Sequence, residues 1–183
     1  MSSHPFVDAC QAIAPRLGTR VSLWRDEAAL FALFACEDDG IVATYSDRDD
    51  PVWKEDAVEI FLAPGDPSEY FEIESSPRGT IFDARVVSPD GARETMRVDS
   101  AWDCEGLLAA IRIEPARQTE VLIRVPFKGL GRTSPRPGER WLANFYRIDR
   151  SEEFGDQYTA WRPTMKSPAD FHVPAAFGEI VFL

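Results

Sequence analysis

Residues 57–62, with the sequence AVEIFL, carry the clearest strand signal in the chain. Val58, Ile60 and Leu62 fall on one face of an extended segment, and Glu59 falls on the opposite face. This alternation is typical of a β-strand that buries one face in a core. The stretch therefore predicts a sheet in which Glu59 points away from the main core.

The same pattern returns in residues 70–75, where Phe71 and Ile73 share one face and Glu72 lies on the other. Helical periodicity is weak and confined to residues 7–13. Turn signals rich in glycine and proline separate further short strands. These strands are predicted at residues 19–24, 30–36, 41–45, 80–87, 107–113, 120–127, 141–149 and 178–183. The sequence thus predicts an all-β fold, an antiparallel β-sandwich of the jelly-roll type.

The length of 183 residues fits one domain, which we place at residues 1–183 with residues 1–18 as an N-terminal extension. A chain of this length buries a core without disulfides or structural metal. The three cysteines are widely spaced and form no disulfide or zinc pattern. The N-terminus lacks the basic and apolar regions of a signal peptide. We therefore expect a cytoplasmic location, or an extracytoplasmic one if a leader has been removed.

The net charge of −11 bears on the class of partner. Nucleic acids and anionic membranes both attract concentrated basic surfaces, so neither is an expected partner. The charge is compatible with neutral ligands and with bound cations. It leaves the oligomeric state open.

Recognised catalytic patterns are absent from the sequence: it has no nucleophile elbow, phosphate loop, dinucleotide fingerprint or zinc motif. Glu59 with Glu72 or Glu74 is a conceivable glycosidase pair, because glycosidases use two carboxylates. Abundant acidic residues make such pairs by chance, so solvated or structural carboxylates are the favoured interpretation. We expect no enzyme activity from this chain; if it is associated with an enzyme, it serves as an accessory module of a glycoside hydrolase.

Four segments in order resemble the family 9 carbohydrate-binding modules, best known as appendages of bacterial xylanases. They are residues 48–62 (RDDPVWKEDAVEIFL), 79–84 (GTIFDA), 141–148 (WLANFYRI) and 158–161 (YTAW), the last with the closing Phe177-Gly178. The resemblance implies a β-sandwich of the jelly-roll kind that binds a mono- or oligosaccharide without catalysis, in carbohydrate catabolism. It requires no cofactor.

Trp53 and Trp161 are the predicted walls of the sugar site. Sugars present C–H patches that stack on aromatic faces, together with hydroxyls that need donors and acceptors. Two tryptophans at these motif positions sandwich a sugar in the family, and the resemblance assigns that role here. Trp53 lies in an acidic turn just before a strand, where an indole stays accessible.

The resemblance also implies polar ligands. Glu59 matches a residue that accepts hydrogen bonds from sugar hydroxyls, and Asn144 matches a polar residue that donates to one. The chain departs from the family where Glu72 replaces an expected arginine and Tyr146 replaces an expected glutamine. An ionised Glu72 cannot donate and stands near another carboxylate, so the family's preference for reducing ends does not carry over.

Arg85 and Arg147 are the candidate replacement donors. Parity sets Arg147 on the face opposite Asn144, so the two reach one site only if the strand twists or bulges between them.

Family members also bind calcium structurally, and loop carboxylates are suitable ligands. Acidic runs at residues 37–39 and 47–56 place such a site near Asp38 or Asp49. No EF-hand spacing is present, and a solvated acidic loop is the favoured interpretation.

Two other functions compete with sugar binding. Related sandwich domains of the DOMON group hold haem, for which Met96, Met165 and His172 are the candidate axial ligands. A Soret band in purified protein distinguishes this function from sugar binding. The third interpretation is an accessory protein whose sugar site has been lost.

Overall fold

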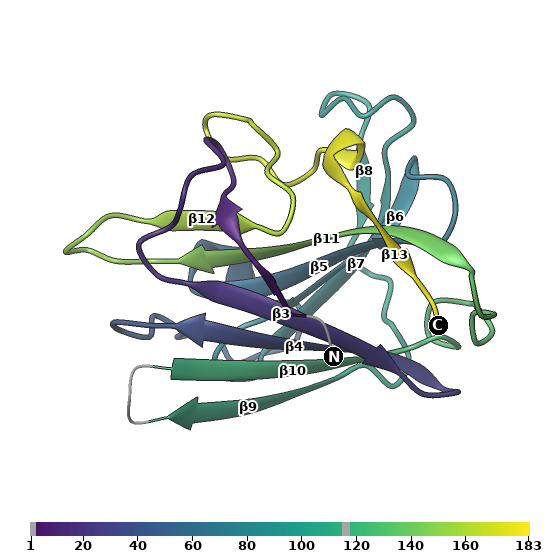
Figure 1. The fold of residues 1–183 in the computed structure, drawn as a ribbon, viewed down its shortest axis with the longest axis horizontal. Helices are drawn as coiled ribbons and strands as arrows, with labels where there is room; N and C mark the ends of the chain where they lie inside the picture. The colour runs from purple at the N-terminus through teal and green to yellow at the C-terminus, as the bar shows by residue number, and fades with distance from the viewer. Residues whose placement is uncertain (1–2, 115–117) are drawn as a thin grey trace.

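The computed structural model describes residues 3–114 and 118–183 and consists of two antiparallel sheets packed face to face (Figure 1). The first sheet has the order β1-β3-β4-β10-β9. Its strands are β1 (Ser3–Pro5), β3 (Thr19–Arg25), β4 (Ala29–Glu37), β9 (Leu108–Glu114) and β10 (Gln118–Pro126).

The second sheet has the order β2-β12-β11-β5-β6-β7-β8, and β13 also pairs with β11. Its strands are β2 (Val7–Asp8), β5 (Ala57–Ala63), β6 (Glu69–Ser75), β7 (Ile81–Val87), β8 (Arg97–Asp99), β11 (Arg140–Asp149), β12 (Gln157–Ala160) and β13 (Gly178–Val181). Helix within the described ranges is limited to two single 3-10 turns, η1 (Val52–Lys54) and η2 (Pro174–Ala176). The predicted all-β sandwich is confirmed. No helix of these residues has the length and apolar character needed to cross a membrane.

The main core lies between the two sheets. Val58, Ile60 and Leu62 of β5 point into it, as the alternation predicts, and Phe34 of β4 meets them from the first sheet. Cys36 is buried in the same core, and the three cysteines are free thiols. The inward face of β5 therefore holds the sandwich together.

The outward face of the second sheet is also covered. Phe61, Tyr70 and Tyr146 form a second cluster there, under the chain segment that carries Phe171. As a result all seven residues of β5 are buried, although one face of the strand carries Glu59 among apolar residues. Glu59 consequently lies inside the protein, beneath loops.

One sequence prediction of local structure is wrong, and the weak helical periodicity corresponds to no helix. Residues 41–45 form no strand, because their backbone bonds to side chains: Val42 N–H donates to Asp56 and Thr44 N–H donates to Glu55. Residues 7–13 form no helix, because Val7–Asp8 pairs with β12 as β2, and the Asp8 carboxylate accepts the N–H groups of the following turn.

The predicted N-terminal extension contributes to both sheets over its described part. Ser3–Pro5 pairs with β3, and Val7–Asp8 pairs with β12. Two short strands, β8 and β12, were not predicted as strands. Both are too short to show a clear alternation, at three and four residues.

Gly178 of β13 packs closely against Trp161, so a substitution there tests where β13 lies. A Cβ atom there would come within 2.5 Å of the Trp161 ring, whereas a Cβ at Gly40 would meet nothing within 4 Å. We expect Gly178→Ala to lower the free energy of unfolding by about 1–3 kcal/mol, as overpacked substitutions do, and Gly40→Ala to change it by about 1 kcal/mol or less. Urea unfolding followed by circular dichroism measures both. Equal effects would contradict the packing of Trp161 against β13.

Candidate functional site

A cleft of about 390 Å³ lies over the outward face of the second sheet. Trp53, from the η1 turn before β5, stands at its side, and three glutamates from β5 and β6 line its floor. The glutamates are Glu59, Glu72 and Glu74, and we call them the glutamate triad. This Trp53 cleft is thus an aromatic wall beside a group of carboxylates.

Trp53 is held at its backbone and partly exposed at its side chain. Its ring packs edge-on against Phe82 with 4.8 Å between centroids, and its carbonyl accepts a hydrogen bond from Arg150 Nη2 at 2.8 Å. Trp53 is still 38% exposed. Among the large hydrophobic residues that line the cleft, Val98 has a higher exposure, at 44%. The indole is therefore fixed in place and available to a ligand.

The glutamate triad follows from strand pairing. Glu59 and Glu74 are register partners in β5 and β6, and Glu72 lies two residues along on the same face. The three are 2%, 1% and 6% exposed, and one carboxylate oxygen from each lies within 4.8 Å of the others. Of the two expected environments, solvated or structural, the solvated one does not apply here, because these glutamates are buried under the loops that cover this face of the sheet.

Burial and crowding raise the pKa values of two members of the triad, Glu59 and Glu74. Desolvation raises the pKa of Glu59 well above its ordinary value, and the neighbouring Glu72 raises it further. Desolvation likewise raises the pKa of Glu74, with added repulsion from Glu59 and Glu72. Glu59 and Glu74 on the floor of the cleft therefore favour binding a cation or a proton over both staying ionised.

Further polar groups ring the cleft, and sequence analysis assigned none of them to the sugar site. His172 Nε2 lies 3.4 Å from Glu72 Oε1, and its Nδ1 lies 2.8 Å from the Tyr70 hydroxyl. Arg93 forms a fork with Asp170, donating through Nε and Nη2. Parity could have placed Tyr70 beside Glu72, but only the fold brings the segment of His172 over them.

Trp161 lies away from the Trp53 cleft. Its backbone N–H donates to Phe145 O, and its ring lies 5.7 Å from the Phe145 ring, against Gly178. Together with Trp24 it lines a second groove of about 720 Å³. The structure therefore does not bring the two predicted walls together. Tyr158 and Phe171 are among the aromatic residues that line the cleft with Trp53.

Asn144 and Tyr146 have structural partners. Asn144 is fully buried; its Nδ2 donates to Arg162 O at 2.8 Å, and its Oδ1 accepts the Arg162 N–H at 3.0 Å. The Tyr146 hydroxyl donates to Phe171 O, and the two rings stack at 4.2 Å. Asn144 is thus not available as the predicted donor to a sugar hydroxyl, because its side chain ties β11 to the chain after β12. Tyr146 instead positions Phe171, which lines the cleft.

The two replacement donors also lie elsewhere. Arg147 is 3% exposed and binds Asp38 and Asp149, because parity turns it toward the other face of the sheet. Arg85 is exposed and donates to Glu69 at 2.8 Å. Neither arginine therefore supplies the hydrogen-bond donor that is missing where Glu72 stands in place of the expected arginine.

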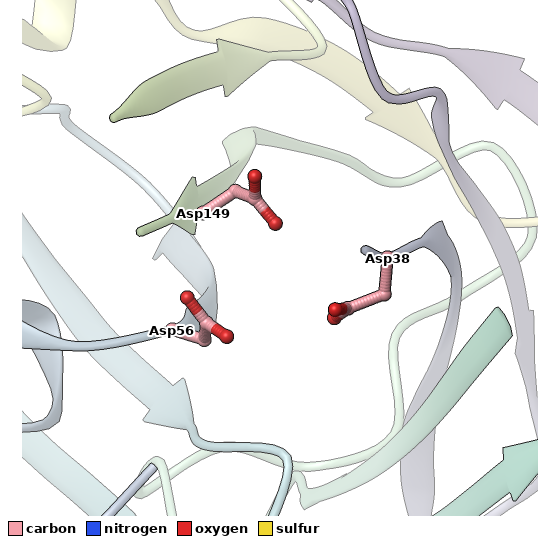
Figure 2. Close-up of side chains that lie close together, drawn as sticks. All are labelled: Asp38, Asp56 and Asp149. Carbon is pink, nitrogen blue, oxygen red and sulfur yellow. The ribbon is translucent and has the colours of Figure 1, made fainter. Parts of the chain in front are cut away.

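Asp38 belongs to a buried cluster with Asp56 and Asp149, whose side chains point toward one another (Figure 2). Each of the six carboxylate oxygens already accepts a hydrogen bond. The donors are the N–H groups of Gly40, Val42 and Arg150, Arg16 Nη2, and Arg147 Nη2 to both Asp38 and Asp149. The Arg147 guanidinium is therefore the internal cation of this cluster, and a calcium ion does not fit it without displacing that group.

Asp49 belongs to a comparable cluster with Asp83 and Asp103. Arg48 bridges the three, with Nε 2.6 Å from Asp103 and 3.9 Å from Asp49, and Nη2 on Asp83. The Cys104 N–H also donates to Asp83 at 2.6 Å. Both predicted metal positions are thus acidic clusters, and in each an arginine takes the place that calcium would occupy.

The chain matches the sequence profile described as carbohydrate-binding family 9 over residues 11–182. The chain belongs to this family. The family is one of non-catalytic binding modules, which agrees with the predicted class of function. No curated protein sequence matches the chain.

Solved structures share the fold of this family 9 module. A candidate carbohydrate-binding protein from Bacteroides uniformis superposes with a TM-score of 0.78 at 17% identity, covering 100% of this chain and 87% of that one. A family 9 module from Caldicellulosiruptor kristjanssonii in complex with cellotriose gives 0.67 at 14% identity, covering 99% and 82%. The same kind of module from that organism in complex with glucose gives 0.63 at 16% identity, covering 98% and 84%.

The haem alternative is not favoured. The layer between the sheets is filled by the buried side chains of the main core. Met165 is 61% exposed, whereas Met96 and His172 both contact the Tyr70 hydroxyl on the outward face of the second sheet. The three candidate ligands thus do not converge on a space between the sheets.

The raised pKa of Glu74 predicts how stability depends on pH. Above the ordinary carboxyl pKa of 4.5, the folded protein keeps protons that the unfolded chain has lost, so the free energy of unfolding falls as pH rises. Glu74→Gln removes this loss. With metal ions removed by a chelator, we expect the free energy of unfolding of the variant to equal that of the wild type near pH 4 and to exceed it at pH 8.

Denaturation at a series of pH values measures this, and Glu69→Gln, at the exposed end of the same strand, is the matched control with the wild-type slope. An unchanged slope in Glu74→Gln would contradict the buried triad.

Proposed function

We propose that the Trp53 cleft is the sugar-binding site of this family 9 module, and that it binds glucose or a glucose-containing oligosaccharide without catalysis. The observation that carries the proposal is the partly exposed Trp53 beside buried carboxylates in one cleft. An aromatic surface with a few convergent polar groups is the arrangement that a sugar requires.

The parts of the cleft suit different parts of a pyranose ring. The Trp53 indole offers a surface for the C–H face of the sugar. Glu59 and Glu72 accept hydrogen bonds from hydroxyls, and carboxylates are strong acceptors for such donors. Arg93 and His172 also line the cleft and carry N–H groups that can donate to a sugar. The cleft volume of about 390 Å³ is within the usual range of small-ligand sites.

The choice of glucose is supported by the two Caldicellulosiruptor modules, whose structures hold cellotriose and glucose. The proposal differs from the sequence prediction in its second wall: Tyr158 and Phe171 take the place of Trp161. Loss of the sugar site is disfavoured, because the cleft retains an accessible indole and carboxylate acceptors.

A binding role also fits the placement of the carboxylates. Glycoside hydrolysis uses two carboxyl groups that flank the scissile bond. The glutamate triad comes from two adjacent strands, so its members approach a ligand from one side only. Structural calcium at Asp38 or Asp49 forms no part of the proposal, and the cytoplasmic location stays a prediction.

Trp53→Ala tests the site directly. Removing the stacking surface should weaken glucose or cello-oligosaccharide binding by about 30-fold or more, as loss of an interface hot spot does. The melting temperature should change little, because the residue is 38% exposed. Isothermal titration and thermal melting measure the two effects on one variant.

Trp24→Ala is the control, because Trp24 lines the second groove and stacks on Phe31 at 5.4 Å. It should keep the wild-type affinity. Retained affinity in Trp53→Ala, or loss in Trp24→Ala alone, would overturn the assignment of the cleft.

A further inference from the structure

Among the residues that the structure describes, three groups of three carboxylates lie close enough to share a cation. The Asp38 group surrounds Arg147, and the Asp49 group surrounds Arg48. The glutamate triad makes no salt bridge with an arginine or lysine within the described ranges; its one ionic contact there is His172 Nε2, 3.4 Å from Glu72. The glutamate triad is therefore about as buried as the Asp38 group, but it has no arginine to compensate its charge within the described ranges.

The other cations of the cleft are committed elsewhere. Arg93 pairs with Asp170, and Arg150 pairs with Asp156 while donating to the carbonyl of Trp53. Each of these arginines thus has an aspartate of its own, and neither forms a salt bridge with the triad in the described ranges, although the charge of Arg150 reaches Glu59 at longer range.

Glu74 gives a second, independent sign of a ligand. It is 1% exposed, and its Oε2 atom is buried without a hydrogen-bond partner among the described residues. A buried oxygen left unpaired is costly and needs an explanation such as an ion. The atom belongs to the least exposed residue of the triad, which strand pairing sets against Glu59.

We propose that Glu59, Glu72 and Glu74 bind a calcium ion at the floor of the Trp53 cleft, and that this ion takes part in sugar binding. Calcium is a hard cation that prefers carboxylate oxygens in flexible geometry at 2.3–2.6 Å. Oxygens within 4.8 Å of one another are close enough to share one ion once small side-chain rotations bring each of them to that distance. The second half of the proposal rests on the proposed function, because sugar hydroxyls complete the coordination above the triad.

An ion fits this place better than an ammonium group on a sugar. The unpaired Glu74 oxygen is buried, so a bulky group attached to a pyranose ring does not reach it. A small ion is able to contact one oxygen from each of the three carboxylates. The site is also distinct from structural calcium at Asp38 or Asp49, where arginine already supplies the charge.

Calcium titration of the whole chain tests the site without any sugar. Calorimetry at pH 7 should show a calcium site in the wild type that weakens at least tenfold in Glu74→Gln, because one anionic ligand is lost. Asp103→Asn, in the Arg48 cluster, is the matched control and should keep this site. The variant Glu74→Gln should still fold, since it removes a buried charge. Failure to bind calcium, or equal binding by Glu74→Gln, would overturn the proposal.

A second titration tests the link to the ligand, with glucose in calcium and in chelator. We expect at least a tenfold loss of affinity in chelator for the wild type. Equal affinity in both buffers would refute the link while leaving the proposed function intact, and absence of glucose binding in both would refute the proposed function itself. Glucosamine that binds more tightly than glucose in chelator would assign the triad to an ammonium group and overturn the calcium assignment.

Discussion

Strand β5 is buried on both faces, and the rest of the molecule is arranged around that constraint. On one side Val58, Ile60 and Leu62 pack against the first sheet. On the other, Phe61 and Glu59 lie under the segment that carries Phe171 and His172. A strand that is apolar on one face and mixed on the other demands two different coverings: a dense core inside and a polar cleft outside.

The three acidic clusters show how the chain handles buried negative charge. Two of them contain an arginine, so the buried carboxylates of Asp38, Asp149 and Asp83 keep hydrogen bonds and opposite charge. The glutamate triad lies where an arginine is expected from the family, and the substitution by Glu72 turns a donor into another acceptor. The same exchange that removes a ligand for sugar hydroxyls creates a site for a cation. Departure from the family pattern is therefore the most informative feature of the cleft.

Much of the fold could be predicted because it depends on local periodicity. Parity alone placed Val58 and Ile60 inward and put Glu59 with Glu72 on the opposite face, and both assignments are confirmed. The β-branched composition of residues 41–45 predicts a strand. It does not reveal that the side chains of Asp56 and Glu55 accept the backbone N–H groups of this segment.

The site was less predictable, because it depends on long-range contacts. Trp161 shares a motif with the family, yet its ring turns toward Phe145 and Gly178. His172 joins the cleft only because its segment folds back over Tyr70 and Glu72. Asn144 and Arg147 were read as ligands from their positions, whereas burial gives each a partner within the protein. Sequence spacing identifies a strand face, but it does not show which loop covers that face.

The measurement that tests the account most directly is a nitrogen–proton correlation NMR titration of the indole groups with cello-oligosaccharide. The chain has five tryptophans, each with its own Nε1–H resonance. Sugar binding in the Trp53 cleft predicts that the Trp53 resonance shifts with saturation, while the resonances of Trp24 and Trp161, in the second groove, stay in place. A shift of Trp24 and Trp161 with an unmoved Trp53 would contradict it and place the sugar in the other groove.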